Sequence, residues 1–109
     1  MLILKNCRLV PELTEGFGGQ AADIAIDGKT IKEIAPAGKL NAPDAEVLDI
    51  KGKTVLPGFF DLHAHLMFTH QDYNALMLRP QNRYVLDCMK YAESYLRLGY
   101  TTVRDCGND

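Results

Sequence analysis

Two histidines separated by a single residue carry the clearest chemical signal in the sequence. His63 and His65 follow a short apolar segment that begins after Pro57-Gly58, a pair typical of turns. Because successive side chains of a strand point to opposite faces, both imidazoles would project from one side. Neutral imidazole is a good ligand for Zn²⁺ and similar ions, although such pairs also occur as ordinary surface or core residues. The spacing by itself is a weak signal for a shared divalent metal ion, and the sequence around the pair strengthens it.

Three further polar residues are candidates for orienting the ligands of such a site or for lining its pocket. Asp61 lies two residues before the first histidine, where its carboxylate would orient a ligand ring as a hydrogen-bond acceptor. His70 lies five residues after the second histidine, in a predicted loop, and is interpreted as a pocket or surface residue more than as a third ligand. Asp105 ends a predicted strand and could reach the rim of the site. An ion pair with Arg104 or a loop hydrogen bond is its simpler role.

The histidines are positioned by a predicted strand that starts at Phe59, with a helix and a second strand after it. Gly99 ends the helix, predicted over residues 82–98, and a β-branched run at 100–103 predicts the second strand. This order is typical of a parallel βαβ unit with a right-handed crossover. The helix is expected to bury the apolar side chains found at helical spacing, which are Val85, Leu86, Met89, Ala92 and Leu96. A second stripe is interpreted as core packing and not as an aromatic ligand box: Tyr84, Cys88, Tyr91 and Tyr95.

The first 56 residues contain only strand and turn patterns. Residues 2–10 predict a strand, and residues 22–26 and 30–34 predict a hairpin because Asp27-Gly28 between them suits a tight turn. Residues 46–50 and 54–56 flank Lys51-Gly52-Lys53 and predict a second hairpin. The expected result is a small antiparallel β domain over residues 1–56.

Composition excludes several classes of function. The 12 Lys and Arg residues against 14 Asp and Glu residues give a net charge of -2, which offers no electrostatic basis for binding nucleic acid or an anionic membrane. No stretch has the length of a signal peptide or membrane span, so a cytoplasmic location is expected. The 3 cysteines are far apart and suggest buried thiols. Cys106, just beyond a predicted strand end, is the one that could approach a site.

The stretch from Val55 to His65 resembles the first barrel strand of the amidohydrolase superfamily of metal-dependent hydrolases. Residues 49–54 and 99–105 also match that family. The closer resemblance is to the branch that contains imidazolonepropionase-like and prolidase-like hydrolases. It covers nearly the whole chain, as the opening portion of such an enzyme.

The resemblance implies an α/β chain with two parts. Residues 1–56 would be the N-terminal part of a small antiparallel β-sandwich domain, and residues 57–109 would be strand 1, helix 1 and strand 2 of a TIM (β/α)8 barrel. A complete barrel takes roughly 250 residues, so the barrel that begins at Phe59 is expected to be incomplete. We expect the missing C-terminal part, or self-association, to cover the exposed edges.

The resemblance also implies a metal-dependent chemistry. In the superfamily the His-X-His pair binds one or two divalent ions, commonly zinc, with ligands from later strands. Only His63 and His65 carry over to this sequence, and no catalytic residue is expected within it. The implied reaction of the full-length enzyme is hydrolysis of an amide, cyclic amide or amidine C–N bond, in a small molecule or dipeptide, by metal-activated water. The chain alone is expected to be inactive, and a non-catalytic binding or assembly protein with the same framework is the alternative hypothesis.

Overall fold

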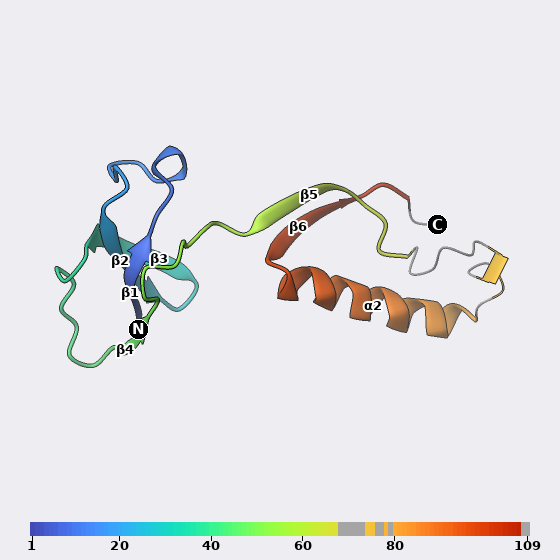
Figure 1. The fold of residues 1–109 in the computed structure, drawn as a ribbon. Helices are drawn as coiled ribbons and strands as arrows, with labels where there is room; N and C mark the ends of the chain where they lie inside the picture. Colours follow the sequence, from blue (N-terminus) through green and yellow to red (C-terminus); the bar gives the residue numbers. More distant parts are fainter. Residues whose placement is uncertain (68–73, 76–77, 79, 108–109) are drawn as a thin grey trace. The chain divides into compact units, whose positions relative to one another are not determined.

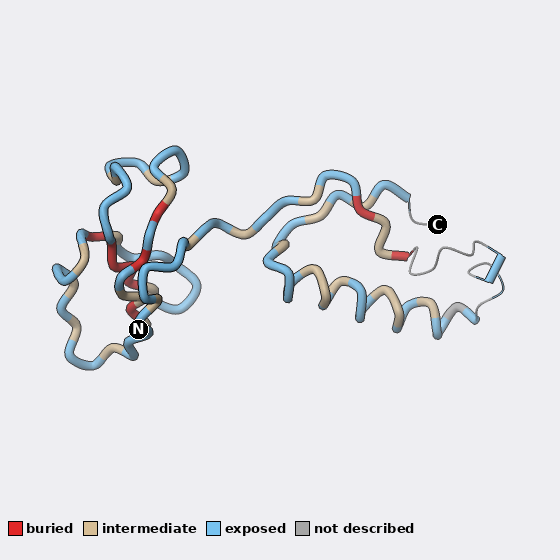
Figure 2. The backbone as a smooth tube through the Cα atoms, in the orientation of Figure 1, coloured by how far each residue is buried: buried red, intermediate tan, exposed pale blue. Residues whose placement is uncertain are grey.

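A computed structural model describes residues 1–67, 74–75, 78 and 80–107 of the chain. The chain divides into two compact units, Met1–Leu56 and Pro57–Asp109, which are described separately (Figure 1). Most of the buried residues belong to the first unit, as Figure 2 shows. In the described part of the chain, no helix has the length and apolar character needed to cross a membrane.

The first unit is built on one four-stranded sheet with the order β3-β2-β1-β4. Its strands are β1 (Leu2–Arg8), β2 (Ala21–Asp27), β3 (Thr30–Pro36) and β4 (Glu46–Asp49), and the short 3₁₀ helix η1 (Pro11–Leu13) follows β1. The hairpin predicted around Asp27-Gly28 is confirmed: Asp27 pairs with Thr30, and Gly28 has a φ of 59°. That positive φ is the conformation a tight hairpin turn requires.

The second predicted hairpin is wrong. β4 runs parallel to β1, and Thr54 forms a parallel bridge with Arg8 on the same neighbour. The residues between them do not reverse the chain, because Lys51 and Gly52 both have positive φ and carry it past an irregularity in β1. The sheet is therefore mixed: it is antiparallel across β1, β2 and β3, and parallel between β1 and β4.

The irregularity in β1 is a bulge, and it determines which side chains of the strand enter the core. The register of β1 on β2 shifts between Leu4 and Cys7, and Asn6 in the bulge has a φ of 55°. Asn is among the residue types that tolerate this left-handed conformation. The shift places Cys7 beside Ala22, so both lie in the core cluster with Leu9 and Ile24.

One buried carboxylate holds the bulge in place. Asp23 on β2 is fully buried, and its two oxygens accept hydrogen bonds from the backbone N–H groups of Asn6 (3.0 Å) and Gly38 (2.8 Å). On the exposed side, Asp49 accepts bonds from the Asn6 side chain and from the Lys51 backbone. The bond from the Asn6 amide and that from the Lys51 N–H lower the pKa of Asp49.

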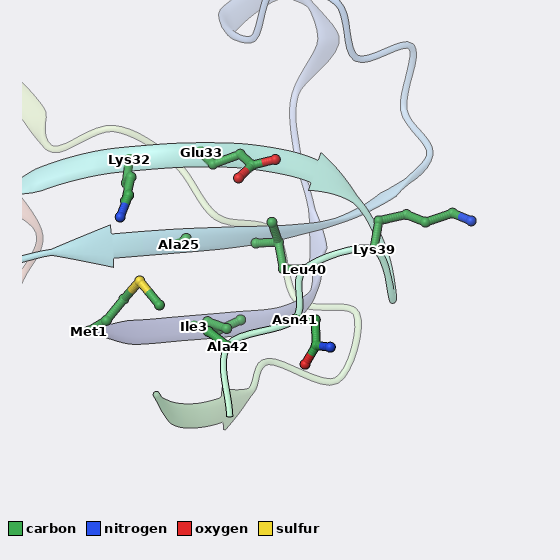
Figure 3. A pocket seen from close by; sticks show the side chains of 9 residues that line it. All are labelled: Met1, Ile3, Ala25, Lys32, Glu33, Lys39, Leu40, Asn41 and Ala42. Carbon is green, nitrogen blue, oxygen red and sulfur yellow. The ribbon is translucent and has the colours of Figure 1, made fainter. Parts of the chain in front are cut away.

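A hollow of about 350 Å³ lies on the sheet within this unit, under the connection that leads to β4 (Figure 3). Its apolar walls include Met1, Ile3 and Ala25, and its polar rim includes Lys32 and Lys39. None of its lining residues belongs to the segment that carries the histidines.

The second unit is a βαβ unit. The strands β5 (Phe59–Ala64) and β6 (Tyr100–Asp105) form a parallel two-stranded sheet, and the helix α2 (Gln81–Arg97) lies between them in the sequence. Gly99 follows the helix with a φ of 91°, which confirms it as the helix-ending residue. No closed barrel is formed in the part of the chain that the structure describes.

The buried face of α2 differs from the prediction. The predicted apolar stripe is largely exposed, with Val85 and Leu86 at 56%, Leu96 at 64% and Met89 at 65%. The neighbouring stripe is the more covered one, because Tyr84, Cys88 and Tyr95 are only partly exposed. Packing on two strands requires only one narrow face of a helix, and here Tyr95 contacts Tyr100 of β6. The core role predicted for this second stripe fits the contact better than the role predicted for the first.

Replacing Asp23 tests the buried carboxylate. Asp23→Asn should lower the free energy of unfolding of the first unit by about 1–3 kcal/mol, because an amide offers one acceptor oxygen and would turn its NH₂ toward an N–H donor. NMR-detected hydrogen exchange of the β1 amides measures the loss. Asp27→Asn, the same change at an exposed position of β2, is the control. Equal protection in both variants would contradict the role assigned to Asp23.

Replacing Gly58 tests the close approach of the two strands. An added Cβ would overlap Oγ1 and Cγ2 of Thr101 and lie 2.8 Å from its Cβ, so rotation of the threonine cannot relieve the clash. Gly58→Ala should destabilise the second unit by about 1–3 kcal/mol. Urea unfolding can be followed by tyrosine fluorescence, because all 5 tyrosines lie in residues 57–109 and tryptophan is absent.

The matched control is Gly107→Ala in the same unit. Its Cβ would meet only His65, at the ordinary distance of 3.5 Å. Gly107→Ala should keep the unfolding midpoint of the unchanged chain, and a Gly58→Ala midpoint that is also unchanged would show that Gly58 tolerates a side chain.

Candidate metal centre

The imidazoles of His63 and His65 converge. Their Nε2 atoms are 3.2 Å apart, and their ring centroids are 5.1 Å apart with the planes at 61°. His63 lies in β5 and His65 is the residue that follows the strand end. Alternation along the strand therefore places both rings on one side, as the spacing predicted.

This separation suits a shared metal ion. Two nitrogens bound at 2.0–2.1 Å to a tetrahedral zinc ion lie about 3.3 Å apart. The observed 3.2 Å is also the length of a hydrogen bond between one protonated and one unprotonated imidazole nitrogen. In both cases each ring directs Nε2 to the same point, which is the arrangement two metal ligands require.

Asp61 holds the strand at the first histidine. One carboxylate oxygen accepts a hydrogen bond from the backbone N–H of His63 at 3.0 Å, and the other accepts one from the hydroxyl of Tyr95 at 3.1 Å. Asp61 thus accepts hydrogen bonds from a backbone amide and from a phenol hydroxyl. These hydrogen bonds support the backbone of His63, and the role predicted from the sequence, orientation of a ligand ring, stays a prediction.

Tyr95 lies near the C-terminal end of α2 and was predicted only as core packing. Its ring contacts Tyr91 and Tyr100 edge to face, at centroid distances of 5.6 and 5.5 Å. Burial, and then the hydrogen bond to Asp61, raise the pKa of the Tyr95 hydroxyl, so it stays a hydrogen-bond donor at neutral pH. Its place on the sheet-facing stripe is the one sequence signal that could have indicated this role.

The end of β6 holds the chain on the other side of the histidines. Arg104 donates from Nε to the carbonyl of Leu62 at 2.9 Å, and the N–H of Cys106 bonds to the carbonyl of Ala64 at 2.8 Å. Asp105 accepts a bond from the N–H of Leu66, directly after the second histidine, at 3.3 Å. Backbone groups before, between and after the two histidines are therefore fixed by β6 and by Cys106, the residue that follows it.

The other predicted residues have different outcomes. Asp105 makes loop hydrogen bonds, to Leu66 and at 3.2 Å to the N–H of Gly107, as its simpler role predicted. His70 lies outside the described residues. The prediction of buried thiols holds for Cys7 and is wrong for Cys106, which is exposed with its Sγ facing the carbonyls of Leu62 and Arg104.

Burial and nearby carboxylates raise the pKa of two thiols. Burial is the larger cause for both Cys7 and Cys88, with Asp23 and Asp105 the leading carboxylates. Both thiols are therefore kept protonated, which is unsuited to nucleophilic or metal-binding thiolate chemistry. Within residues 1–67, 74–75, 78 and 80–107, no group of three or more His, Cys, Asp or Glu side chains could hold a metal ion.

Comparisons by sequence match part of the chain to known proteins. The profile described as Amidohydrolase family matches residues 46–94. Dihydroorotase from Staphylococcus aureus (strain Mu50 / ATCC 700699) is 53% identical over 47 residues, which are 43% of this chain and 11% of that protein. Dihydroorotase from Streptococcus thermophilus (strain CNRZ 1066) is 42% identical over 65 residues, which are 60% of this chain and 14% of that protein.

Solved structures match nearly the whole chain. The crystal structure of amidohydrolase eaj56179 superimposes with a TM-score of 0.81 and 28% identity, over 99% of this chain and 26% of that one. Prolidase eah89906, solved with N-methylphosphonate-L-proline, has a TM-score of 0.82 and 27% identity over 97% of this chain and 26% of its own. The chain thus covers about a quarter of these structures and a smaller share of the curated relatives. Over residues 46–94 the chain is thus similar to the amidohydrolase family, and over nearly its whole length it is similar to the N-terminal quarter of solved amidohydrolases.

Proposed function

We propose that this chain supplies the first two metal ligands, His63 and His65, of a metal-dependent amidohydrolase that hydrolyses C–N bonds in small molecules or dipeptides. Zinc is the proposed metal, as one or two ions. The observation that carries the proposal is the 3.2 Å separation of the two Nε2 atoms, which fits two ligands on one ion. The relatives support the reaction class, because dihydroorotases and a prolidase are among them.

The residues of this chain would bind and orient the ion. For both Nε2 lone pairs to face the metal, each histidine must carry its proton on Nδ1. The backbone at His63 is fixed by Asp61 and the backbone after His65 is fixed by Asp105. A metal held there supplies a Lewis acid for the scissile carbonyl and an acidified water as the nucleophile. We assign substrate recognition and proton transfer to the leaving nitrogen to residues other than His63 and His65.

Metal binding by the chain tests the proposal. Zinc added to the chain should shift the ring signals of His63 and His65 together in NMR spectra, with weak affinity, since catalytic zinc sites use about three protein ligands. His63→Ala and His65→Ala should each abolish the joint shift. Metal content of the purified chain, measured by inductively coupled plasma mass spectrometry, should be far below one ion per chain.

His70→Ala is the matched control for this experiment. If zinc binding survives the loss of His63 and His65 but not the loss of His70, the proposed pair is not the ligand pair. About one tightly held ion per chain would instead mean that further ligands complete a site within these residues or between copies.

Activity of the chain gives a second test. With two ligands and no assigned proton shuttle, the chain should show no turnover of dihydroorotate or of an Xaa-Pro dipeptide above that of a zinc blank. The assay follows substrate loss by chromatography. Turnover that disappears in His63→Ala would contradict this expectation, because the two histidines would then be working in a complete site.

A further inference from the structure

The contact of Tyr95 with Asp61 connects the helix α2 to the metal-ligand strand. We propose that Tyr95 is a positioning residue for His63: its hydroxyl fixes the Asp61 carboxylate, and that carboxylate fixes the backbone of His63. The proposal rests on the proposed function in treating His63 as a metal ligand. It adds a residue 32 positions away in the sequence to the requirements of the site.

The geometry supports a direct mechanical connection. Tyr95 Oη donates to one oxygen of Asp61 at 3.1 Å, and the N–H of His63 donates to the other at 3.0 Å. One rigid carboxylate group therefore joins a helix side chain to the ligand backbone. Because its two oxygens are fixed by different elements, the carboxylate cannot rotate without losing one of the bonds.

The strand needs this support at the histidine. The pairing of β5 with β6 is irregular between Asp61 and Ala64, so the ladder does not by itself fix the backbone of the residues between them. The bond from His63 to Asp61, two residues back, is a local turn-like contact that a flexible carboxylate would hold poorly. The hydrogen bond from the Tyr95 hydroxyl restricts rotation of the Asp61 carboxylate.

Tyr95 is itself well placed to act as a fixed point. Its ring lies between Tyr91 of the same helix and Tyr100 of β6, and Tyr100 contacts Phe59 at the start of β5, with centroids 5.7 Å apart. This aromatic series connects α2 to both strands. The ring should therefore keep its place when only its hydroxyl is removed, which makes Tyr95→Phe a clean test.

The experiment measures zinc affinity by NMR titration of the histidine ring signals and measures hydrogen exchange of the His63 amide. Tyr95→Phe should weaken zinc binding by about threefold to tenfold, somewhat less than the typical loss of a direct partner of a ligand. Exchange at the His63 amide should rise severalfold. Tyr91→Phe is the matched control, because it makes the same change one helical turn away and should leave both values unchanged.

A double-variant cycle separates positioning from general stability. Asp61→Asn alone should weaken zinc binding, and adding Tyr95→Phe to it should change little more, since Tyr95 acts through the Asp61 carboxylate. Full additivity of the two losses would overturn the proposal. So would a Tyr95→Phe chain that equals Tyr91→Phe in zinc affinity, whatever its thermal stability.

The two readouts also distinguish this proposal from the proposed function. If zinc shifts neither histidine ring in the unchanged chain, the metal assignment fails. The position of His63 is then judged by amide exchange alone: a rise confined to His63 in Tyr95→Phe supports the connection, and no rise overturns it.

Discussion

The parallel pairing of β5 with β6 is the constraint on which the second unit depends. Parallel neighbours cannot be joined by a tight turn, so β5 and β6 need a long connection, and here that connection contains α2. The pairing also brings the carboxyl ends of both strands to one edge of the sheet. His63 and His65 lie at the end of β5, and Asp105 lies at the end of β6. The close approach of Gly58 to Thr101 at the opposite end shows how little space the two strands leave between them.

Much of this fold was predictable because the deciding signals are local. Asp27-Gly28 predicts its hairpin, and Gly99 predicts the helix end, through backbone conformations that few other residues adopt. The second predicted hairpin failed for the opposite reason. Lys51-Gly52 resembles a reversing turn in sequence. Its conformation instead follows the bulge at Asn6 in the paired strand, more than forty residues away in the chain. A pattern within one segment cannot indicate an irregularity in its partner strand.

The wrong prediction for the apolar stripe of α2 has the same cause, because the sequence of one segment does not show what packs against it. Helical spacing correctly predicts that one face is apolar, but which apolar face contacts the sheet depends on what else surrounds the helix. With β5 and β6 as its described neighbours, α2 uses Tyr95, while Val85 and Met89 remain exposed. Exposed apolar side chains on β5 as well, such as Phe60 and Leu62, agree with a chain that covers only part of the structures it matches.

For the candidate site, the sequence indicates the two proposed metal ligands but not the residues that hold them in place. His-X-His on a strand is a local pattern, and alternation is enough to place both rings on one side. Their approach to 3.2 Å needs more, because each ring must also take a compatible rotamer on a fixed backbone. That backbone is held by Asp61, Tyr95 and Asp105, of which two come from α2 and β6. A ligand pair ordered by the fold loses less side-chain entropy on binding a metal than a pair on a free strand. If these two histidines are metal ligands as proposed, the long-range contacts, and not the motif alone, set their affinity for the ion.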